Sequence, residues 1–133
     1  MEICLMDDDI DEHEIFMMAL RKVPIDIKCL LFSDPMEGLD RFKFDKSYVP
    51  RFIFIDINMP KYNGMECLKE IKKIKHLEET KILMFSTSSN PSDIQKSKDL
   101  GAYGFLIKPL RISDLTDSLV KLFNTREQET IIF

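Results

Sequence analysis

Acidic residues follow two short apolar runs of this chain of 133 residues. Asp7 and Asp8 follow the run at residues 3–6, and Asp56 follows the run at residues 52–55. Three carboxylates that meet at one place repel one another, so their charged forms need a cation. Oxygen ligands with room for water suit Mg²⁺, which prefers one or two carboxylates together with a phosphate oxygen. A carboxylate can also attack a phosphoryl group and form an aspartyl phosphate.

A hydroxyl group and an ammonium group follow two later apolar runs. Ser86 comes after residues 82–85, and Lys108 comes after residues 103–107. Phosphoryl transfer depends on in-line positioning and on neutralisation of charge by metal and ammonium. The residue types at the ends of these four runs therefore predict a phosphoryl site centred on Asp56.

The apolar runs predict the elements that bring these groups together. Uninterrupted apolar runs of about four to eight residues are typical of strands that are buried on both faces of a parallel sheet. Such runs begin near residues 3, 25, 52, 82 and 103, and each precedes a segment with helical spacing of apolar residues. This alternation predicts an α/β fold, with a doubly wound five-stranded parallel sheet and five helices. Ligands bind at the carboxyl ends of such strands, where Asp56 is expected.

Breaker and capping residues set the expected limits of these elements. The first helix is expected over residues 12–23, closed by the proline that follows, and the second strand over residues 25–32. Residues 90–100 predict a short polar helix. Because that helix has only Ile94 and Leu100 to bury, we expect it to be loosely held.

Composition and charge narrow the class of protein. With 44% hydrophobic and 32% charged residues, the chain is expected to be globular rather than disordered. Its net charge of -4 argues against a nucleic-acid surface, which needs a concentrated basic face. No apolar run approaches the roughly 20 residues of a membrane span, and the N-terminus lacks the pattern of a signal peptide. We therefore expect a cytoplasmic protein with one domain and no membrane partner.

The cysteines and histidines show no pattern of a metal site. Cys4, Cys29 and Cys67 lack metal-ligand spacing, and those at positions 4 and 29 lie inside apolar runs, so reduced, buried thiols are expected. His13 and His76 stand in charged surroundings and are expected at the surface.

The acidic residues at positions 7–9 allow other interpretations. They could cap a helix, because first-turn carboxylates stabilise the helix dipole. A calcium-binding loop fails, since its glycine position holds Glu12 and its closing glutamate position holds Met18. An aspartate-nucleophile phosphatase needs an acid two residues after its nucleophile, where this chain has Asn58. A flavodoxin-like cofactor carrier needs a phosphate-binding loop after the first strand, where carboxylates would repel phosphate.

Taken in order, the strand ends resemble the response-regulator receiver domain of two-component signalling, in its stand-alone, chemotaxis-like form. The resemblance runs from residue 3 to about residue 124. It is carried by five features, namely Asp7-Asp8, Asp56, Met59-Pro60 with Gly64, Ser86, and Lys108-Pro109. Each feature is weak alone, but five in order are highly specific. The resemblance implies a flavodoxin-like sheet of strand order 2-1-3-4-5, in a receiver domain at residues 1–124 with a short tail at 125–133.

The resemblance also implies roles for individual residues. Asp56 would be the phosphoacceptor, Lys108 would pair with the phosphoryl group, and Ser86 would hydrogen-bond to that group once it has formed. Phe105 would be the aromatic switch, whose ring turns inward as the serine hydroxyl moves. The peptide bond between Lys108 and Pro109 would be cis.

The implied cofactor is Mg²⁺. Its ligands would be Asp8, Asp56 and the backbone carbonyl of Asn58, while Asp7 would act mainly through water. Asn58 and Ser88 lie where the family tunes the lifetime of the phosphoryl group.

The resemblance implies a phosphoacceptor that assists its own phosphorylation and dephosphorylation, rather than an enzyme. The donor would be a histidine kinase or a histidine phosphotransfer protein, and the signal would pass to a downstream protein through the face formed by residues 90–124. A phosphorelay intermediate, a phosphate sink and a receiver-like module that binds without phosphorylation are the alternatives. The apolar end at residues 130–133 is expected to be frayed, or else to pack against a partner or a second copy in a homodimer.

Overall fold

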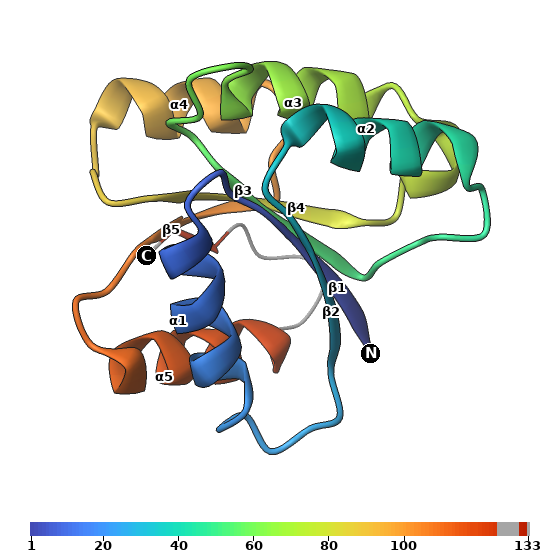
Figure 1. Cartoon of the computed structure of the whole chain (residues 1–133). Coiled ribbons are helices and arrows are strands. Elements are labelled where there is room, and N and C mark those ends of the chain that lie inside the picture. Colours follow the sequence, from blue (N-terminus) through green and yellow to red (C-terminus); the bar gives the residue numbers. More distant parts are fainter. Residues whose placement is uncertain (125–130, 133) are drawn as a thin grey trace.

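The apolar runs of the sequence form the strands of a single parallel sheet. The computed structural model describes residues 1–124 and 131–132. Six strands lie in the order β2-β1-β3-β4-β5-β6, with helices on both faces (Figure 1). The strands are β1 (Glu2–Met6), β2 (Lys28–Phe32), β3 (Phe52–Asp56), β4 (Lys81–Ser86), β5 (Gly104–Ile107) and β6 (Ile131–Ile132). The helices are α1 (Ile10–Leu20), α2 (Pro35–Phe44), α3 (Gly64–Lys72), the short 3-10 helix η1 (Lys75–Leu77), α4 (Pro91–Asp99) and α5 (Ile112–Phe123).

The predicted order of the first five strands, 2-1-3-4-5, is confirmed. β6 was not predicted: it is a two-residue strand that pairs in parallel with β5, with Gly104 opposite Ile131 and Phe105 opposite Ile132. A two-residue segment carries too little pattern to be recognised in a sequence. The rest of the predicted tail, at residues 125–130 and 133, lies outside the described residues.

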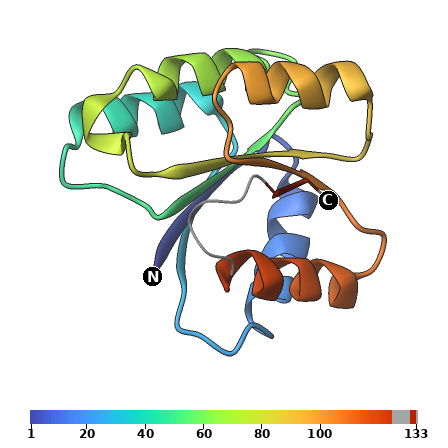
Figure 2. The same cartoon turned by 180° about the vertical axis from the view of Figure 1, so that it is seen from behind.

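The helices form one layer on each face of the sheet. Helices α2, α3 and α4 cover one face, and α1 and α5 cover the other, as the two opposite views show (Figures 1 and 2). Under the first layer, Leu68 and Ile71 of α3 pack on the sheet. Under the second, Phe16 of α1 meets Phe54 of β3 edge-on, with ring centroids 5.1 Å apart. Because both faces are packed, the carboxyl ends of the strands are held in fixed positions.

Side-chain caps begin four helices directly after strand-end loops. In each case an Asp or Asn side chain accepts a hydrogen bond from a backbone N–H of the first turn, which has no partner inside the helix. These caps are Asp9, Asp34, Asn63 and Asn90. At the start of α3, a Cβ on Gly64 would lie 2.3 Å from the backbone oxygen of Asp56. Only glycine therefore lets α3 begin so close to the end of β3.

The limits of two elements differ by two or more residues from those predicted. The first helix spans Ile10–Leu20 rather than residues 12–23, because Asp9 caps it early and the chain turns out of the helix after Leu20. The second strand begins at Lys28 rather than at residue 25, and Ile25 is exposed in the preceding connection.

The bond between Lys108 and Pro109 also differs from the expectation. The described part of the chain contains no cis peptide bond, so this bond is trans and the prediction of a cis bond was wrong. Trans is the isomer that X–Pro bonds favour by about 0.5–1 kcal/mol.

Several other expectations agree with the structure. Cys4 and Cys67 are buried free thiols, as expected, whereas Cys29, also expected to be buried, is a free thiol that is only half-buried. Helix α4 fully buries only Ser97, which agrees with the loose anchoring predicted from its polar sequence. Among the residues that the structure describes, no helix combines the length and the apolar character needed to cross a lipid bilayer.

Candidate functional site

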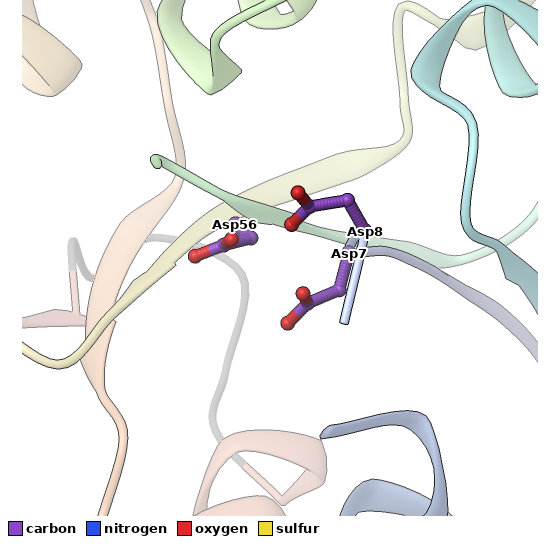
Figure 3. A group of neighbouring side chains, drawn as sticks. All are labelled: Asp7, Asp8 and Asp56. Carbon is purple, nitrogen blue, oxygen red and sulfur yellow. The ribbon is translucent and has the colours of Figure 1, made fainter. Parts of the chain in front are cut away.

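Three carboxylates meet at the carboxyl edge of the sheet. Met6 lies opposite Ile55 in the β1–β3 pairing, so Asp7 and Asp8 follow β1 beside Asp56 at the end of β3 (Figure 3). One carboxylate oxygen from each of Asp7, Asp8 and Asp56 lies within 4.8 Å of the others. Asp7 is 0% and Asp56 is 7% exposed, whereas Asp8 is exposed. The predicted convergence of these residues is therefore present in the structure.

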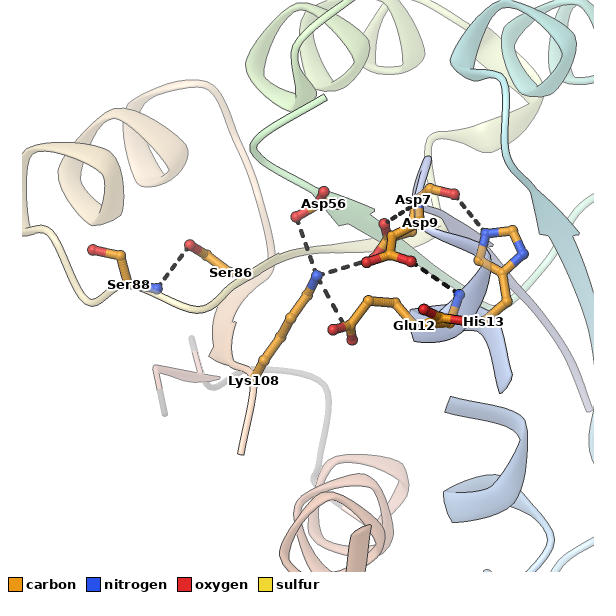
Figure 4. Close-up of polar contacts among 9 residues, drawn as sticks. Asp7, Asp9, Glu12, His13, Asp56, Ser86, Ser88 and Lys108 are labelled. Carbon is orange, nitrogen blue, oxygen red and sulfur yellow. Dashed lines mark hydrogen bonds and ion pairs between the residues drawn. The ribbon is translucent and has the colours of Figure 1, made fainter. Parts of the chain in front are cut away.

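Lys108 reaches into this cluster from the end of β5. Its Nζ donates to Oδ2 of Asp7 at 3.0 Å and to Oδ1 of Asp56 at 3.3 Å (Figure 4). Its backbone N–H donates to the carbonyl of Ser86 at 2.7 Å, which fixes the start of the side chain beside β4. The Lys108 side chain is only 10% exposed, and its ammonium lies 5.2 Å from the centre of the Phe85 ring.

The close approach of these charges changes their pKa values. Burial raises the pKa of Asp56, and the charge of Asp7 raises it further, while Lys108 and a backbone hydrogen bond from Asn58 oppose the shift. Burial lowers the pKa of Lys108, but hydrogen bonding and charge from Asp7, with the charges of Asp56 and Glu12, outweigh this effect and leave that pKa raised. One ammonium therefore does not fully compensate the carboxylates around it, and the site favours a further cation.

The serine hydroxyl predicted at the end of β4 points toward its own loop. Ser86 is 1% exposed, and its Oγ accepts a hydrogen bond from the backbone N–H of Ser88 at 3.1 Å (Figure 4). β4 lies directly beside β3, with Phe85 opposite Asp56. Ser86 therefore follows the residue that lies opposite Asp56, and Ser88 is exposed on the loop that follows β4.

The remaining predicted residues take up different environments. Phe105 of β5 is 1% exposed and lies within the apolar cluster that also contains Met84. Its ring therefore already points inward in this structure. Asn58 is exposed in the loop after β3, two residues after Asp56.

Two residues of the site were not predicted. Oε2 of Glu12 lies 4.0 Å from Nζ of Lys108. His13, expected at the surface, is buried, and its Nε2 makes a hydrogen bond with the carbonyl oxygen of Asp7. His13 shares the buried face of α1 with Phe16 and Leu20, three and seven residues later, and this helical spacing was the available signal.

A cavity of about 380 Å³ opens beside the acidic cluster. Its lining includes Asp8 after β1, Ile10 at the start of α1, Pro35 at the start of α2, and Met59 from the loop after β3. Ile10 is 71% exposed, so the approach to the carboxylates has an apolar side.

A doubly wound sheet whose carboxyl edge holds an acidic cluster, a lysine and a hydroxyl defines the receiver class of signalling proteins. The chain belongs to the response regulator receiver domain family, whose model matches residues 3–120. It is 26% identical over 117 residues to response regulator Rcp1 of Synechocystis sp., which covers 85% of this chain and 80% of Rcp1.

Solved structures show the same similarity. The Mn²⁺-bound form of Rcp1 has a TM-score of 0.76 at 25% identity, covering 91% of this chain and 90% of that chain. The phosphorylated cyanobacterial phytochrome response regulator RcpA has a TM-score of 0.78 at 26% identity, covering 91% and 89%. Chemotaxis protein CheY4 of Vibrio cholerae has a TM-score of 0.74 at 26% identity, covering 90% and 96%. The predicted family and fold are confirmed.

Proposed function

We propose that this receiver domain, at residues 1–124, accepts a phosphoryl group on Asp56 with Mg²⁺ as cofactor and then signals by contact with another protein. The observation that carries the proposal is the carboxyl edge itself. There the carboxylate oxygens of Asp7, Asp8 and Asp56 lie within 4.8 Å of one another, and Lys108 bonds to two of these residues.

The donor set fits Mg²⁺. Three carboxylates offer hard oxygen ligands, and the raised pKa of Asp56, caused by burial and by Asp7, indicates that negative charge at the site is incompletely compensated. Asp8, Asp56 and the backbone carbonyl of Asn58 would hold the ion, and Asp7 would reach it through water. When bound, Mg²⁺ would neutralise charge on the phosphoryl oxygens. The relative Rcp1 has been solved in an Mn²⁺-bound form, which supports a divalent cation here.

Phosphoryl transfer would use the chain's own groups as follows. A carboxylate oxygen of Asp56 attacks phosphorus, and the new O–P bond forms as the bond from phosphorus to the donor breaks. The donor leaves with that electron pair. The ammonium of Lys108, which donates to Asp56 at 3.3 Å, would then donate to a phosphoryl oxygen after only a small movement. The hydroxyl of Ser86, whose oxygen accepts from the N–H of Ser88, would then donate its own proton to a phosphoryl oxygen. The inward movement of the loop that accompanies this bond is the step that Phe105 would sense.

The surroundings of the site suit a protein donor. Ile10 at the start of α1 and Leu110 in the loop after β5 are strongly exposed apolar residues, and Ile10 also lines the cavity beside Asp8. A histidine kinase or a histidine phosphotransfer protein could bury these side chains while its phosphohistidine reaches Asp56. The downstream partner would bind residues 90–124, where α4 is sparsely anchored.

The test is intact-protein mass spectrometry after incubation with acetyl phosphate, with and without Mg²⁺. We expect one phosphoryl group to be added only when Mg²⁺ is present, and none to the Asp56→Asn variant. Incorporation into the Asp56→Asn variant at the wild-type level would place the acceptor elsewhere. If neither acetyl phosphate nor a panel of phosphorylated histidine phosphotransfer proteins modified the wild-type chain, the proposal would be wrong.

A further inference from the structure

A fourth carboxylate reaches the phosphoryl site from helix α1. Glu12 lies in the first turn of α1, three residues after the capping Asp9, and its Oε2 is 4.0 Å from Nζ of Lys108 (Figure 4). The same ammonium bonds to Asp7 at 3.0 Å and to Asp56 at 3.3 Å. Glu12 is neither a residue of the three-carboxylate cluster nor the acceptor, so the family's motif gives it no part.

The contact is long, but its electrostatic effect is not negligible. Coulomb attraction falls only as the inverse of distance, so a pair at 4.0 Å keeps about three quarters of the attraction of a pair at 3.0 Å. The side chain of Glu12 is 29% exposed and that of Lys108 is 10% exposed, so water screens this pair less than it screens a surface ion pair. Three carboxylates, those of Asp7, Asp56 and Glu12, thus act on one ammonium.

We infer that Glu12 is a positioning residue that sets the electrostatic balance of the phosphoryl site through Lys108. This inference rests on the proposed function. Glu12 attracts the ammonium away from the place where a phosphoryl oxygen must bind, and its own charge repels an anionic donor. The same charge attracts a divalent cation. Glu12 therefore slows phosphoryl transfer to Asp56 while it strengthens Mg²⁺ binding.

These two effects have opposite signs, which separates them from damage to the fold. In Glu12→Gln, which keeps the shape of the side chain, we expect phosphorylation by acetyl phosphate at saturating Mg²⁺ to become about three to ten times faster. We expect the dissociation constant for Mg²⁺, measured by isothermal titration calorimetry without donor, to rise about two- to fivefold. A variant with a merely distorted site would lose both rate and affinity.

Two further variants control the comparison. Asp11→Asn removes the same charge from the same first turn of α1, but Asp11 is exposed, so both quantities should stay within about twofold of wild type. Glu12→Asp keeps the charge on a side chain one methylene shorter, so its values should lie between those of wild type and Glu12→Gln. Adding 1 M KCl, where the screening length is about 3 Å, should shrink every difference.

The outcomes separate this inference from the proposed function. An unchanged Mg²⁺ affinity in Glu12→Gln, or a transfer rate equal to or below that of wild type, would overturn the role of Glu12. Failure of every variant, wild type included, to take up a phosphoryl group would count against the proposed function. The comparison of Mg²⁺ affinities would then still decide whether Glu12 strengthens cation binding.

Discussion

Strand β3 buries five consecutive side chains, and the last of them differs in kind from the first four. The apolar residues from Phe52 to Ile55 are 0–2% exposed, and Asp56, at 7%, is almost equally enclosed. Phe54 and Asp56 are two residues apart, so their side chains leave the strand on the same face. Phe54 lies among aromatic rings, whereas Asp56 lies among charges. One strand therefore contributes both to the apolar clusters on the two faces of the sheet and to the candidate site.

The two ends of this strand contribute to stability with opposite signs. Full burial of a large apolar side chain stabilises the fold by about 1.5–3 kcal/mol. Burial of a carboxylate destabilises the fold unless the charge is paired. Pairing of Asp56 with Lys108 compensates only in part, as the pKa of Asp56 indicates, since burial and Asp7 keep it raised. The core stabilises an arrangement of charges that would not form without it, and the negative charge that remains uncompensated favours the binding of a cation.

The largest effect on stability should come from the core end of the strand. Phe54→Ala removes a ring that is 0% exposed and lies edge-on to Phe16 and Phe85 at 5.1 and 6.2 Å. We expect the free energy of unfolding to fall by about 3–5 kcal/mol, because the loss of contacts leaves a cavity. Urea unfolding, monitored by circular dichroism, measures this free energy. Phe44→Ala, at an exposed position of α2, is the matched control and should change it by less than about 0.5 kcal/mol.

A smaller loss should follow removal of the ammonium at the other end. Lys108→Met keeps the apolar stem but leaves Asp7 and Asp56 facing each other without a cation. We expect a loss of about 1–3 kcal/mol in metal-free buffer, because a buried charge deprived of its partner is destabilising. Mg²⁺ should restore more stability to this variant than to wild type. Equal stabilisation of both proteins by Mg²⁺ in thermal unfolding would show that Lys108 and the cation do not share the same carboxylates.

A gain in stability should follow removal of the charge of Asp56. Asp56→Asn keeps an oxygen that accepts from Lys108, and we expect it to add about 1 kcal/mol in metal-free buffer at neutral pH. Because the pKa of Asp56 is raised in the folded state by burial and by Asp7, the folded protein binds its proton more tightly than the unfolded chain does. The stability of wild type should therefore decrease as pH rises from the ordinary range of an Asp carboxyl through the raised pKa, and level off above it.

The Asn variant lacks this titration. The difference in unfolding free energy between Asp56→Asn and wild type should therefore be smallest at acid pH and largest above the raised pKa. A difference that stays constant with pH would mean that the folded structure does not raise the pKa of Asp56.

Much of this arrangement could be predicted from the sequence because it is local. Apolar runs, capping residues and the order of elements predicted five strands, and the parallel topology then placed Asp7, Asp56 and Lys108 at one edge. Gly64 was recognised as part of a motif, but its reason, the approach of α3 to the backbone oxygen of Asp56, is a property of the packed structure.

The contacts of Glu12 and His13 were not predicted, for a related reason. Their contacts depend on how α1 is rotated about its axis, and that rotation is set by the packing of Phe16 on Phe54 and Phe85. Short-range pattern fixes which residues form the helix, but the tertiary core decides which side chains of its first turn reach Lys108. The same limit applies to the trans bond at Lys108–Pro109, which no local pattern distinguished from the cis bond implied by the resemblance.

The smallest effect on stability should come from the polar end of the neighbouring strand. β4 repeats the pattern of β3, with buried apolar residues followed by Ser86. In Ser86→Ala, the lost partner is the N–H of Ser88, which lies on an exposed loop and can bond to water instead. We therefore expect a change of less than about 0.5 kcal/mol in urea unfolding, far below that of Phe54→Ala.

The function of Ser86 should nevertheless depend on its hydroxyl. Phosphoprotein accumulated with acetyl phosphate and Mg²⁺ should be lower in Ser86→Ala and near the wild-type level in Ser86→Thr, which keeps the hydroxyl. A large loss of stability in Ser86→Ala would instead make this hydroxyl a structural group. In that case the division between a stabilising strand body and a functional strand end would not extend from β3 to β4.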